Sequence, residues 1–293
     1  MLDYRVETFL TVCRTLNFTK TAELLNITQP AVSQHIKFLE KYYGAELFEY
    51  KGKKMYLTEE GQMLLNSLTT MTLDENHLKN QLQAFKDEEK NLKFGVTLTV
   101  GEYIIPGPLG RILKRKTSGD VIMKVSNTHH LLEDLDNGEI DFAIVEGYFP
   151  QNEYDYLVYS SEKYVAVCSP ESDLAKGSRL IEELFKETAI IREGGSGTRE
   201  IMQRTLEDRN YNVNDFENII EISNLNAIKK LVEMNCGITF IYKVAVEKEL
   251  EEGRLAEIKI KDFNVNHNIT FIWRKNSIYG DEYKNIYNSF KEA

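Results

Sequence analysis

Residues 18–48 have the sequence FTKTAELLNITQPAVSQHIKFLEKYYGAELF, which carries the clearest local pattern in the chain. Its first part predicts a short helix over 20–25, with Thr19 as N-cap because Thr is favoured at that position. After a turn at 26–27, Thr28 is expected to cap a second helix, and Pro30 suits its first turn because no N–H is needed there. That helix should end near Gly44, since glycine readily adopts the left-handed C-terminal cap. The stretch therefore predicts two helices joined by a tight turn.

The residues on either side extend this pattern. Residues 4–16 place apolar side chains at three- and four-residue spacing, which predicts an amphipathic helix. Its expected buried residues are Val6, Phe9, Leu10, Cys13 and Leu16. On the other side, β-prone runs at 47–50 and 54–57 flank a lysine- and glycine-containing tip, which predicts a hairpin. Three helices followed by a basic hairpin are typical of a winged helix-turn-helix.

The second helix of the pair has two distinct faces. Its expected apolar stripe is Val32, Ile36 and Leu39, which leaves a separate polar face. That face carries Ser33, Gln34 and Lys37. Such a helix fits the major groove of DNA, where polar side chains read base edges, while the hairpin lysines contact phosphates. These lysines are Lys51, Lys53 and Lys54. The alternative is a helix-turn-helix that contacts another protein, which would leave the shared polar face unexplained.

The charge distribution agrees with a DNA-binding N-terminus. The chain of 293 residues has a formal net charge of −10, and an acidic protein is repelled by nucleic acid. Residues 1–58, which we call the head, contain eight Lys and Arg against six Asp and Glu, a net +2 that leaves −12 for the remainder. The composition, 42% hydrophobic and 28% charged, excludes a disordered or collagen-like chain. DNA contact should therefore be confined to the head.

A long helix without proline should follow the head, from about Thr58 to Lys90. Its apolar residues alternate three- and four-residue steps at Leu64, Leu68, Met71, Leu78, Leu82 and Phe85, with Glu75 interrupting the series. A period of 3.5 residues indicates pairing between helices, whereas the alternative is an amphipathic helix packed on its own domain. We predict that residues 59–90 form a linker through which two copies of the chain dimerise.

From residue 91 onward, strands and helices alternate, which is typical of mainly parallel sheets in α/β lobes, so that the fold is α+β overall. We expect an effector domain at 91–293, with lobe I at about 91–160 and 268–293 and lobe II at about 161–267. The chain should cross between the lobes near 160–163 and 265–268. The expected elements include helices at 101–116, 178–185 and 243–253, and two separate strands at 154–160 and 163–169.

Ligands in such folds bind beyond the carboxyl ends of strands, where helix N-termini offer free N–H groups to an anion. Three turns have this character, at 97–101, 126–128 and 192–199. The candidate effector-binding residues are Thr97, Thr99, Val100, Gly101, Asn127, Thr128, Ser196, Gly197, Thr198, Arg199 and, opening a further helix, Asn224 with Asn226. Thr and Ser hydroxyls before helices are alternatively N-caps, and Arg199 could pair with Glu193 or Glu200 instead of an anion.

The sequence offers little support for catalysis. Its five histidines are scattered, and P-loop, GxSxG and HExxH motifs are absent from it. We therefore expect no enzymatic activity, no cofactor and no metal. Cys13, Cys168 and Cys236 are widely spaced, which favours reduced thiols in the cytoplasm. Neither a signal peptide nor a membrane span is expected, since no apolar run is long enough.

The quoted stretch, followed by LTEEG at 57–61, resembles the N-terminal signature of LysR-type transcriptional regulators. The helix pair, the QPAVS core, the LEK-x-x-G-x-x-LF segment and the LT-x-x-G junction occur in the family's order, and the later layout is similar over essentially the whole chain. The resemblance implies a winged-helix head, a linker-helix dimer and a two-lobed effector domain like that of type 2 periplasmic binding proteins.

The resemblance also implies roles for particular residues. The positions facing DNA would be Gln29, Pro30, Ser33, Gln34 and Lys37, with Thr19 and Thr28 near phosphates. The effector pocket would be lined by Thr97, Thr99, Thr128, Ser196 and Thr198. Gln34 and Tyr50 stand where many members carry Arg, so useful DNA binding should need at least a dimer. A homotetramer that contacts RNA polymerase is a further implication.

Together these patterns predict a transcription regulator that binds double-stranded DNA and responds to a small, anionic molecule bound between its lobes. The alternative is a cytoplasmic solute-binding protein or enzyme with two α/β lobes and no regulatory DNA site.

Overall fold

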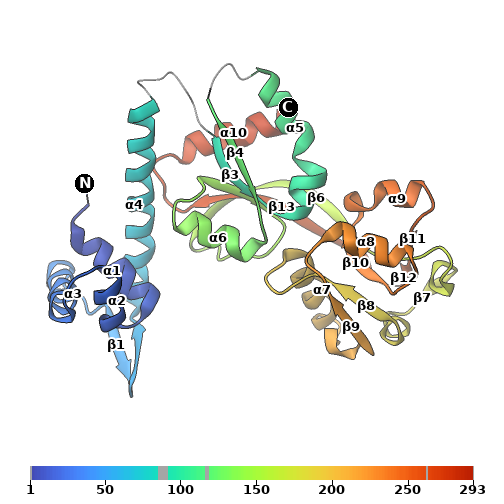
Figure 1. Cartoon of the computed structure of the whole chain (residues 1–293), viewed down its shortest axis with the longest axis horizontal. Coiled ribbons are helices and arrows are strands. Elements are labelled where there is room, and N and C mark those ends of the chain that lie inside the picture. The colour runs from blue at the N-terminus through green and yellow to red at the C-terminus, as the bar shows by residue number, and fades with distance from the viewer. Residues whose placement is uncertain (1, 85–91, 116–118, 262, 293) are drawn as a thin grey trace. The chain divides into compact units, whose positions relative to one another are not determined.

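The computed structural model describes residues 2–84, 92–115, 119–261 and 263–292 (Figure 1). The chain divides into two compact units. The first comprises Met1–Lys86 with Lys275–Ile278, and the second comprises Asp87–Arg274 with Tyr279–Ala293.

The first unit contains three short helices, a hairpin and one long helix. In chain order these are α1 (Tyr4–Thr15), α2 (Phe18–Leu24), α3 (Gln29–Tyr43), β1 (Phe48–Lys51), β2 (Lys54–Leu57) and α4 (Glu59–Ala84). The predicted stripe of α3 is buried in a core with α1 and the hairpin, which confirms the two-faced helix. Leu16 differs from the prediction, because α1 ends at Thr15 and Leu16 is an exposed left-handed C-cap.

The helix ends follow local side-chain chemistry. Thr28 caps α3 by accepting a hydrogen bond from the Ala31 N–H, and Gly44 ends it with φ +70°, as predicted. The predicted N-cap of α2 was wrong: Asn17 caps that helix, and its side chain accepts from the N–H of Thr19. Asn is as good an N-cap as Thr, and here the helix begins one residue before Thr19.

The hairpin packs closely against the start of the long helix. Thr58 joins them, because its hydroxyl donates to the Glu46 carbonyl and accepts from the Gly61 N–H. Gly61 lies so close to the head that a Cβ placed there would be 2.2 Å from the Leu47 carbonyl oxygen. The LT-x-x-G junction is therefore a packing requirement.

Helix α4 follows the predicted linker as far as Ala84; its expected continuation to Lys90, including Phe85, lies outside the described residues. The apolar series of this helix, which we call the seam, differs in burial along the helix. Leu68 is buried in the head's core, whereas Leu78 and Leu82 are 44% and 57% exposed. Glu75 accepts a hydrogen bond from the Leu2 N–H and pairs with Lys79, and these partners lower its pKa. The distal part of the seam thus presents exposed leucines.

The second unit alternates strands and helices. Its strands are β3 (Leu92–Val96), β4 (Val121–Val125), β5 (Phe142–Val145), β6 (Tyr154–Cys168), β7 (Ser178–Arg179), β8 (Thr188–Ile191), β9 (Asn218–Glu221), β10 (Thr239–Tyr242), β11 (Ala256–Glu257), β12 (Lys259–Ile260) and β13 (Val265–Arg274). Its helices are η1 (Val100–Ile104), α5 (Pro106–Arg115), α6 (Thr128–Asp136), η2 (Asp173–Ala175), η3 (Ile181–Lys186), α7 (Gly197–Glu207), η4 (Val213–Asp215), α8 (Leu225–Glu233), η5 (Lys243–Ala245), α9 (Glu247–Glu251) and α10 (Gly280–Glu292).

One mixed sheet runs through this unit in the order β10-β6-β13-β5-β3-β4, with β11 also paired to β6. Strands β3, β4 and β5 are parallel, as are β8 and β9, but β6, β10, β13 and β5 pair antiparallel. The expectation of mainly parallel sheets was therefore only partly right. It missed that 154–160 and 163–169 form one strand, β6, because β13 pairs along most of its length and leaves no break.

Buried layers cover both faces of these strands. In β5, Phe142 and Ile144 pack into one core with α10, while Ala143 and Val145 pack against α6 on the other face. Strand side chains alternate between faces, so the apolar run FAIV is the expected sequence of a strand buried on both sides. We call the layers around β3, β4 and β5 lobe I and those around β8, β9 and β10 lobe II. Figure 1 shows β6 and β13 passing from one to the other.

Three predicted helices differ locally. The region predicted as one helix from 101 to 116 is a π-helical turn, η1, followed by α5 from Pro106, because proline cannot continue a helix from the turn before it. The segments at 178–185 and 243–253 contain the 3₁₀ turns η3 and η5. The first segment begins with strand β7 at Ser178–Arg179, and the second begins with η5, so that only Glu247–Glu251, α9, is an α-helix.

Candidate functional site

Helix α3 presents most of the residues predicted to face DNA. Gln29, Pro30, Gln34 and Lys37 are exposed, and Ser33 is half-buried. The opposite side of the helix is held in the core by Val32, so the polar face is directed away from it. Thr28 and Thr19 are also exposed, in or before the first turns of α3 and α2. This arrangement leaves a polar helix face and two helix N-termini accessible.

The hairpin carries the predicted basic tip. Lys51 closes β1, Gly52 turns the chain with φ +68°, and Lys54 opens β2. Lys51 pairs with Glu49 at 2.7 Å, and this bond raises the pKa of Lys51. Among the described residues, neither Lys53 nor Lys54 forms an ion pair. These two lysines are therefore the hairpin charges most available to a phosphate.

In the second unit, the three predicted turns meet at the boundary of the two lobes. A Cβ placed on Gly195 would lie 3.3 Å from the Cβ of His129, next to the turn that precedes α6. A Cβ on Gly197 would lie 2.6 Å from the Gly147 N, and one on Gly147 would lie 2.5 Å from the Thr128 Oγ1. The turns of lobe I and the loop before α7 of lobe II thus approach each other at glycines where a side chain would clash.

Glu146, which the sequence analysis missed, lies at the centre of this convergence. It follows the last residue of β5 and is only 1% exposed. Its Oε1 accepts a 2.7 Å hydrogen bond from the Thr198 hydroxyl across the lobe boundary. Burial raises the pKa of Glu146, and the hydrogen bond from Thr198 and the positive charge of Arg192 offset this effect only in part. The available signal was a lone acidic residue directly after an apolar strand.

Two buried tyrosines of lobe II lie near Glu146 without contacting its carboxyl group. The Tyr164 hydroxyl donates to the carbonyl oxygens of Thr198 and Phe240, at 2.7 and 3.1 Å. The Tyr242 hydroxyl lies 3.5 Å from the Glu146 carbonyl oxygen and 3.2 Å from the Nδ1 of His267. Burial raises the pKa of both tyrosines well above the ordinary value.

Arg192 is the buried arginine near Glu146, whereas the predicted Arg199 is bonded to other groups. Arg192 follows the end of β8, is 4% exposed and holds Glu193 with its Nε and Nη2 at 2.8 and 2.9 Å. Arg199 donates instead to the Arg192 carbonyl and pairs with Glu221, a partner the sequence analysis did not consider. Its guanidinium is therefore occupied by a neighbouring strand.

Five buried polar atoms near this boundary form no hydrogen bond within the described residues. They are the hydroxyl oxygens of Thr97, Thr99 and Thr128, the Oε2 of Glu146 and the Nη1 of Arg192. Buried polar groups without partners are uncommon in folded proteins, so each of these atoms calls for an explanation. Four of the five follow the ends of β3, β5 or β8, and the fifth, Thr128, is in the first turn of α6.

The other candidates have the following local contacts, and their role in effector binding stays a prediction. Asn127 and Asn224 are the N-caps of α6 and α8, a role that the sequence analysis considered only for Thr and Ser; their side chains accept from the N–H groups of His130 and Ala227. Ser196 stands at the N-cap position of α7 without a side-chain cap bond. Val100 is core, and Gly101 packs on Val96 and Val125.

In the described part of the chain, no group of three or more His, Cys, Asp and Glu residues could hold a metal ion. No helix within the described residues is long and apolar enough to cross a membrane.

Comparisons with known proteins agree with this division. The family description "Bacterial regulatory helix-turn-helix protein, lysR family" matches residues 4–62, and "LysR substrate binding domain" matches residues 86–279. The HTH-type transcriptional activator CmpR of Synechocystis is 31% identical over 278 residues, which cover 93% of this chain and 89% of CmpR. The chain belongs to the LysR family of transcriptional regulators. It is a DNA-binding regulator with an effector-binding domain, which confirms the predicted family, fold class and general function.

Solved structures share the fold at lower identity. A peroxide-bound mutant of Corynebacterium glutamicum OxyR is 21% identical with a TM-score of 0.62, covering 99% of this chain and 91% of that one. The Synechocystis PCC6803 CcmR regulatory domain in complex with 2-PG is 22% identical with a TM-score of 0.61, covering 69% of this chain and 96% of that one. Together with the family match, these results support a DNA-binding regulator over the alternative without a DNA site.

Proposed function

We propose that a small anionic molecule binds at the boundary of the two lobes and thereby controls how this regulator acts on DNA. The observation that carries the proposal is the set of five buried polar atoms, three in lobe I turns, one at Glu146 and one at Arg192, that lack partners in the described residues. An unpaired buried polar group costs about 1–3 kcal/mol, so a ligand that bonds several of them gains substantial affinity.

The chemistry of these groups favours an oxyanion such as a carboxylate, sulfate or phosphate. Three hydroxyls and a guanidinium N–H are hydrogen-bond donors, and the N-terminus of α7 adds a positive dipole end. A charged Glu146 would repel an anion, but burial favours its protonated form, which donates a hydrogen bond instead. CcmR, whose regulatory domain was solved with 2-PG, shares this fold.

On DNA, we infer that α3 reads base edges through Gln29, Pro30, Ser33, Gln34 and Lys37, while Thr19, Thr28, Lys51, Lys53 and Lys54 contact the backbone. A dimer formed through α4 would place two heads on a short interrupted palindrome. The exposed seam leucines support this step. We further propose that the protein forms a tetramer, contacts RNA polymerase and acts in the cytoplasm, where DNA is accessible.

The effector site is tested by thermal unfolding in the presence of sulfate, phosphate, small carboxylates and amino acids. A compound that binds only the folded state raises the melting temperature. Thr99→Ala should lose the shift caused by an active anion, because it removes one of the unpaired hydroxyls. Thr21→Ala, a buried threonine of the head, serves as the control and should keep it. An equal shift in both variants would place the ligand elsewhere.

Control of DNA binding is a separate test. The protein should bind the promoter region upstream of its own gene, and the affinity should fall steeply with salt. Adding the active anion should change DNA affinity, bending or transcription. If it changes none of them, the ligand site stands but its coupling to the head does not.

A further inference from the structure

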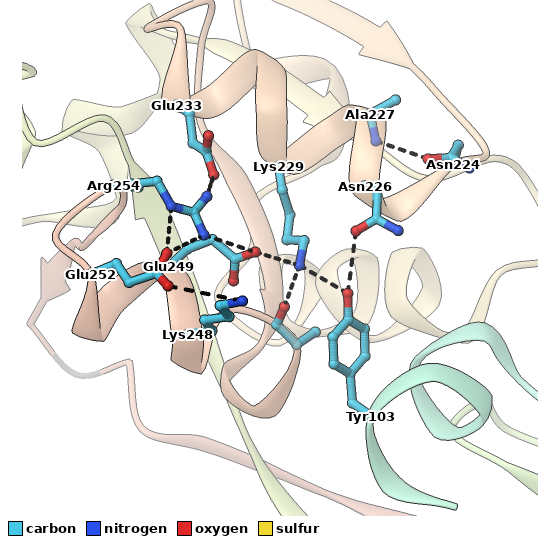
Figure 2. A network of polar contacts seen from close by, with 11 residues as sticks. Tyr103, Asn224, Asn226, Ala227, Lys229, Glu233, Lys248, Glu249, Glu252 and Arg254 are labelled. Atoms are coloured by element: carbon cyan, nitrogen blue, oxygen red, sulfur yellow. Dashed lines mark hydrogen bonds and ion pairs between the residues drawn. The ribbon is translucent and has the colours of Figure 1, made fainter. Parts of the chain in front are cut away.

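A second polar connection between the lobes lies outside the proposed effector site. Figure 2 shows Lys229 of α8 surrounded by three oxygen acceptors. Its Nζ donates to the Glu249 Oε1 at 2.8 Å, to the Ala245 carbonyl at 3.0 Å and to the Tyr103 hydroxyl at 2.9 Å. Glu249 and Ala245 belong to lobe II, whereas Tyr103 is in η1 of lobe I. One of the three ammonium protons therefore bonds across the lobe boundary.

The charge of Lys229 is compensated without Tyr103. Lys229 and Glu249 form an ion pair in which the residues are 5% and 8% exposed. Burial lowers the pKa of Lys229, but its bonds to Glu249 and Tyr103 outweigh that effect and raise it. Breaking the Tyr103 bond would therefore not leave a buried charge unpaired, which is the costly case. Tyr103 is itself half-buried, so water can replace its hydroxyl when the bond opens.

Tyr103 is in the same short segment as two of the unpaired threonines. Thr97 and Thr99 precede η1, and Tyr103 is its fourth residue. The segment is compact, because the Gly101 N–H donates to the Thr97 carbonyl at 2.8 Å and Val100 is fully buried. π-Helical turns are rare and occur often at functional sites. A displacement of Thr99 by a ligand would consequently move Tyr103 relative to Lys229.

The side chain of Tyr103 also rests on lobe II. Its ring packs against the apolar cluster formed by α8, β6 and β10, and the Lys229 ammonium lies 4.9 Å from the ring centroid. The Tyr103 hydroxyl has a long, 3.5 Å contact to the Asn226 Oδ1. The ring thus supplies packing, while the hydroxyl supplies the directional part of the contact.

We propose that the Tyr103 hydroxyl and the Lys229 ammonium form a latch that holds the lobes in the arrangement in which the effector-binding groups converge. The part of this inference that concerns effector affinity rests on the proposed function; the part that concerns lobe arrangement does not. Opening the latch separates the lobe I groups, which are the Thr97–Gly101 turn and Glu146, from Arg192 of lobe II and lowers the population of the binding-competent state. The apparent affinity falls by that fraction.

The test uses full-length protein with one spin label on each lobe, at Glu139→Cys and Glu207→Cys, both exposed positions. Exposed Cys236 is replaced by Ser. Half-buried Cys13 is also replaced by Ser, whereas Cys168 stays, because it is buried and burial raises its pKa to about 11. Labelled protein is diluted into unlabelled protein so that pulsed dipolar spectroscopy reports the distance within one chain.

Tyr103→Phe removes only the hydroxyl and keeps the ring. The latch predicts a longer or broader distance distribution without any ligand. Tyr211→Phe is the matched control, because the Tyr211 hydroxyl bonds Glu182 within lobe II, and its distribution should be that of the parent protein. In a Lys229→Met background, Tyr103→Phe should have no further effect. An unchanged distribution in Tyr103→Phe overturns the latch, and that variant decides the matter even if Lys229→Met does not fold.

A second readout measures binding of inorganic sulfate, or of whichever anion the thermal screen identifies, by calorimetry. Tyr103→Phe should weaken it by about two- to tenfold, the range for one hydrogen bond. Altered distances with no anion binding in the parent protein would support the latch and count against the proposed effector. Altered distances with parent-level affinity in Tyr103→Phe would overturn the affinity part of the proposal.

Discussion

At the residue scale, two helical glycines differ in what surrounds them. Gly61 of α4 lies against the Leu47 carbonyl oxygen and the Leu57 side chain, whereas a Cβ on Gly110 of α5 would meet nothing within 4 Å. Gly61→Ala should lower the free energy of unfolding by about 1–3 kcal/mol, because the backbone must move apart. Gly110→Ala should raise it by about 0.4–1 kcal/mol through the unfolded chain. Denaturant unfolding measures both, and equal effects would show that the junction relaxes freely.

At the same scale, the burial of Glu146 predicts that the stability of the protein depends on pH. The unfolded chain releases this proton near the ordinary glutamate pKa of about 4.3, whereas burial raises the pKa in the folded protein. Between the two values the folded state binds more protons, so its stability falls as pH rises. Glu146→Gln removes this loss and should raise the melting temperature at pH 7 more than at pH 4.5. The nearby charged or titratable groups Arg192, Tyr164 and Tyr242 remain in both proteins. A gain that is the same at both pH values would contradict a raised pKa.

At the element scale, the three lysines of the hairpin differ in whether they form an ion pair. Lys51 is bonded to Glu49, while Lys53 and Lys54 have no ion pair among the described residues. Lys53→Ala or Lys54→Ala should weaken DNA binding about equally for all sequences and reduce the salt slope by about one. Lys51→Ala should reduce it less, because its charge is already partly neutralised. Fluorescence anisotropy at several salt concentrations measures the slopes, and a larger loss from Lys51→Ala would reverse the assignment.

The distal half of α4 carries the prediction for self-association. Leu78 and Leu82 are exposed on the predicted seam and belong to none of the core clusters of the described residues. Leu78→Asp with Leu82→Asp should dissociate the protein into smaller species, since a buried apolar seam does not accept unpaired charge. Asn80→Asp adds charge on another face of the same helix and should leave the assembly intact. Analytical ultracentrifugation distinguishes them; an unchanged mass for the double variant would place the subunit interface elsewhere.

At the scale of the whole molecule, the charge split between head and remainder becomes a functional prediction. The head is +2 and the rest of the chain is −12. Deleting residues 1–58 should abolish DNA binding completely, because the remainder repels a polyanion. Anion affinity should persist, since the unpaired atoms belong to the second unit. Electrophoretic mobility shift and calorimetry on the same preparation measure the two activities. Residual DNA binding by the truncated protein would show a second nucleic-acid site.

The sequence by itself determined the head. Its helix ends depend on one or two neighbouring residues, as Thr28 and Gly44 show, and the stripe of α3 depends only on helical periodicity. The prediction of Thr19 as the N-cap of α2 was wrong because Asn17, two residues earlier, is equally favoured at that position and caps the helix. The LT-x-x-G junction was recognisable for a similar reason, although its packing role at Gly61 was not.

Only the tertiary structure decided the contents of the proposed effector site. Glu146 and Arg192 are far apart in sequence, and each follows a short apolar strand that reads like any other. The sequence predicts Arg199 and not Arg192 as a binding residue, because it does not show which arginine is buried and which is paired with Glu221. Burial, pairing and the resulting pKa values depend on which strand ends meet across β6 and β13. Those are long-range contacts, whereas caps and helix faces are local ones, and this difference separates what the sequence determined from what the fold decided.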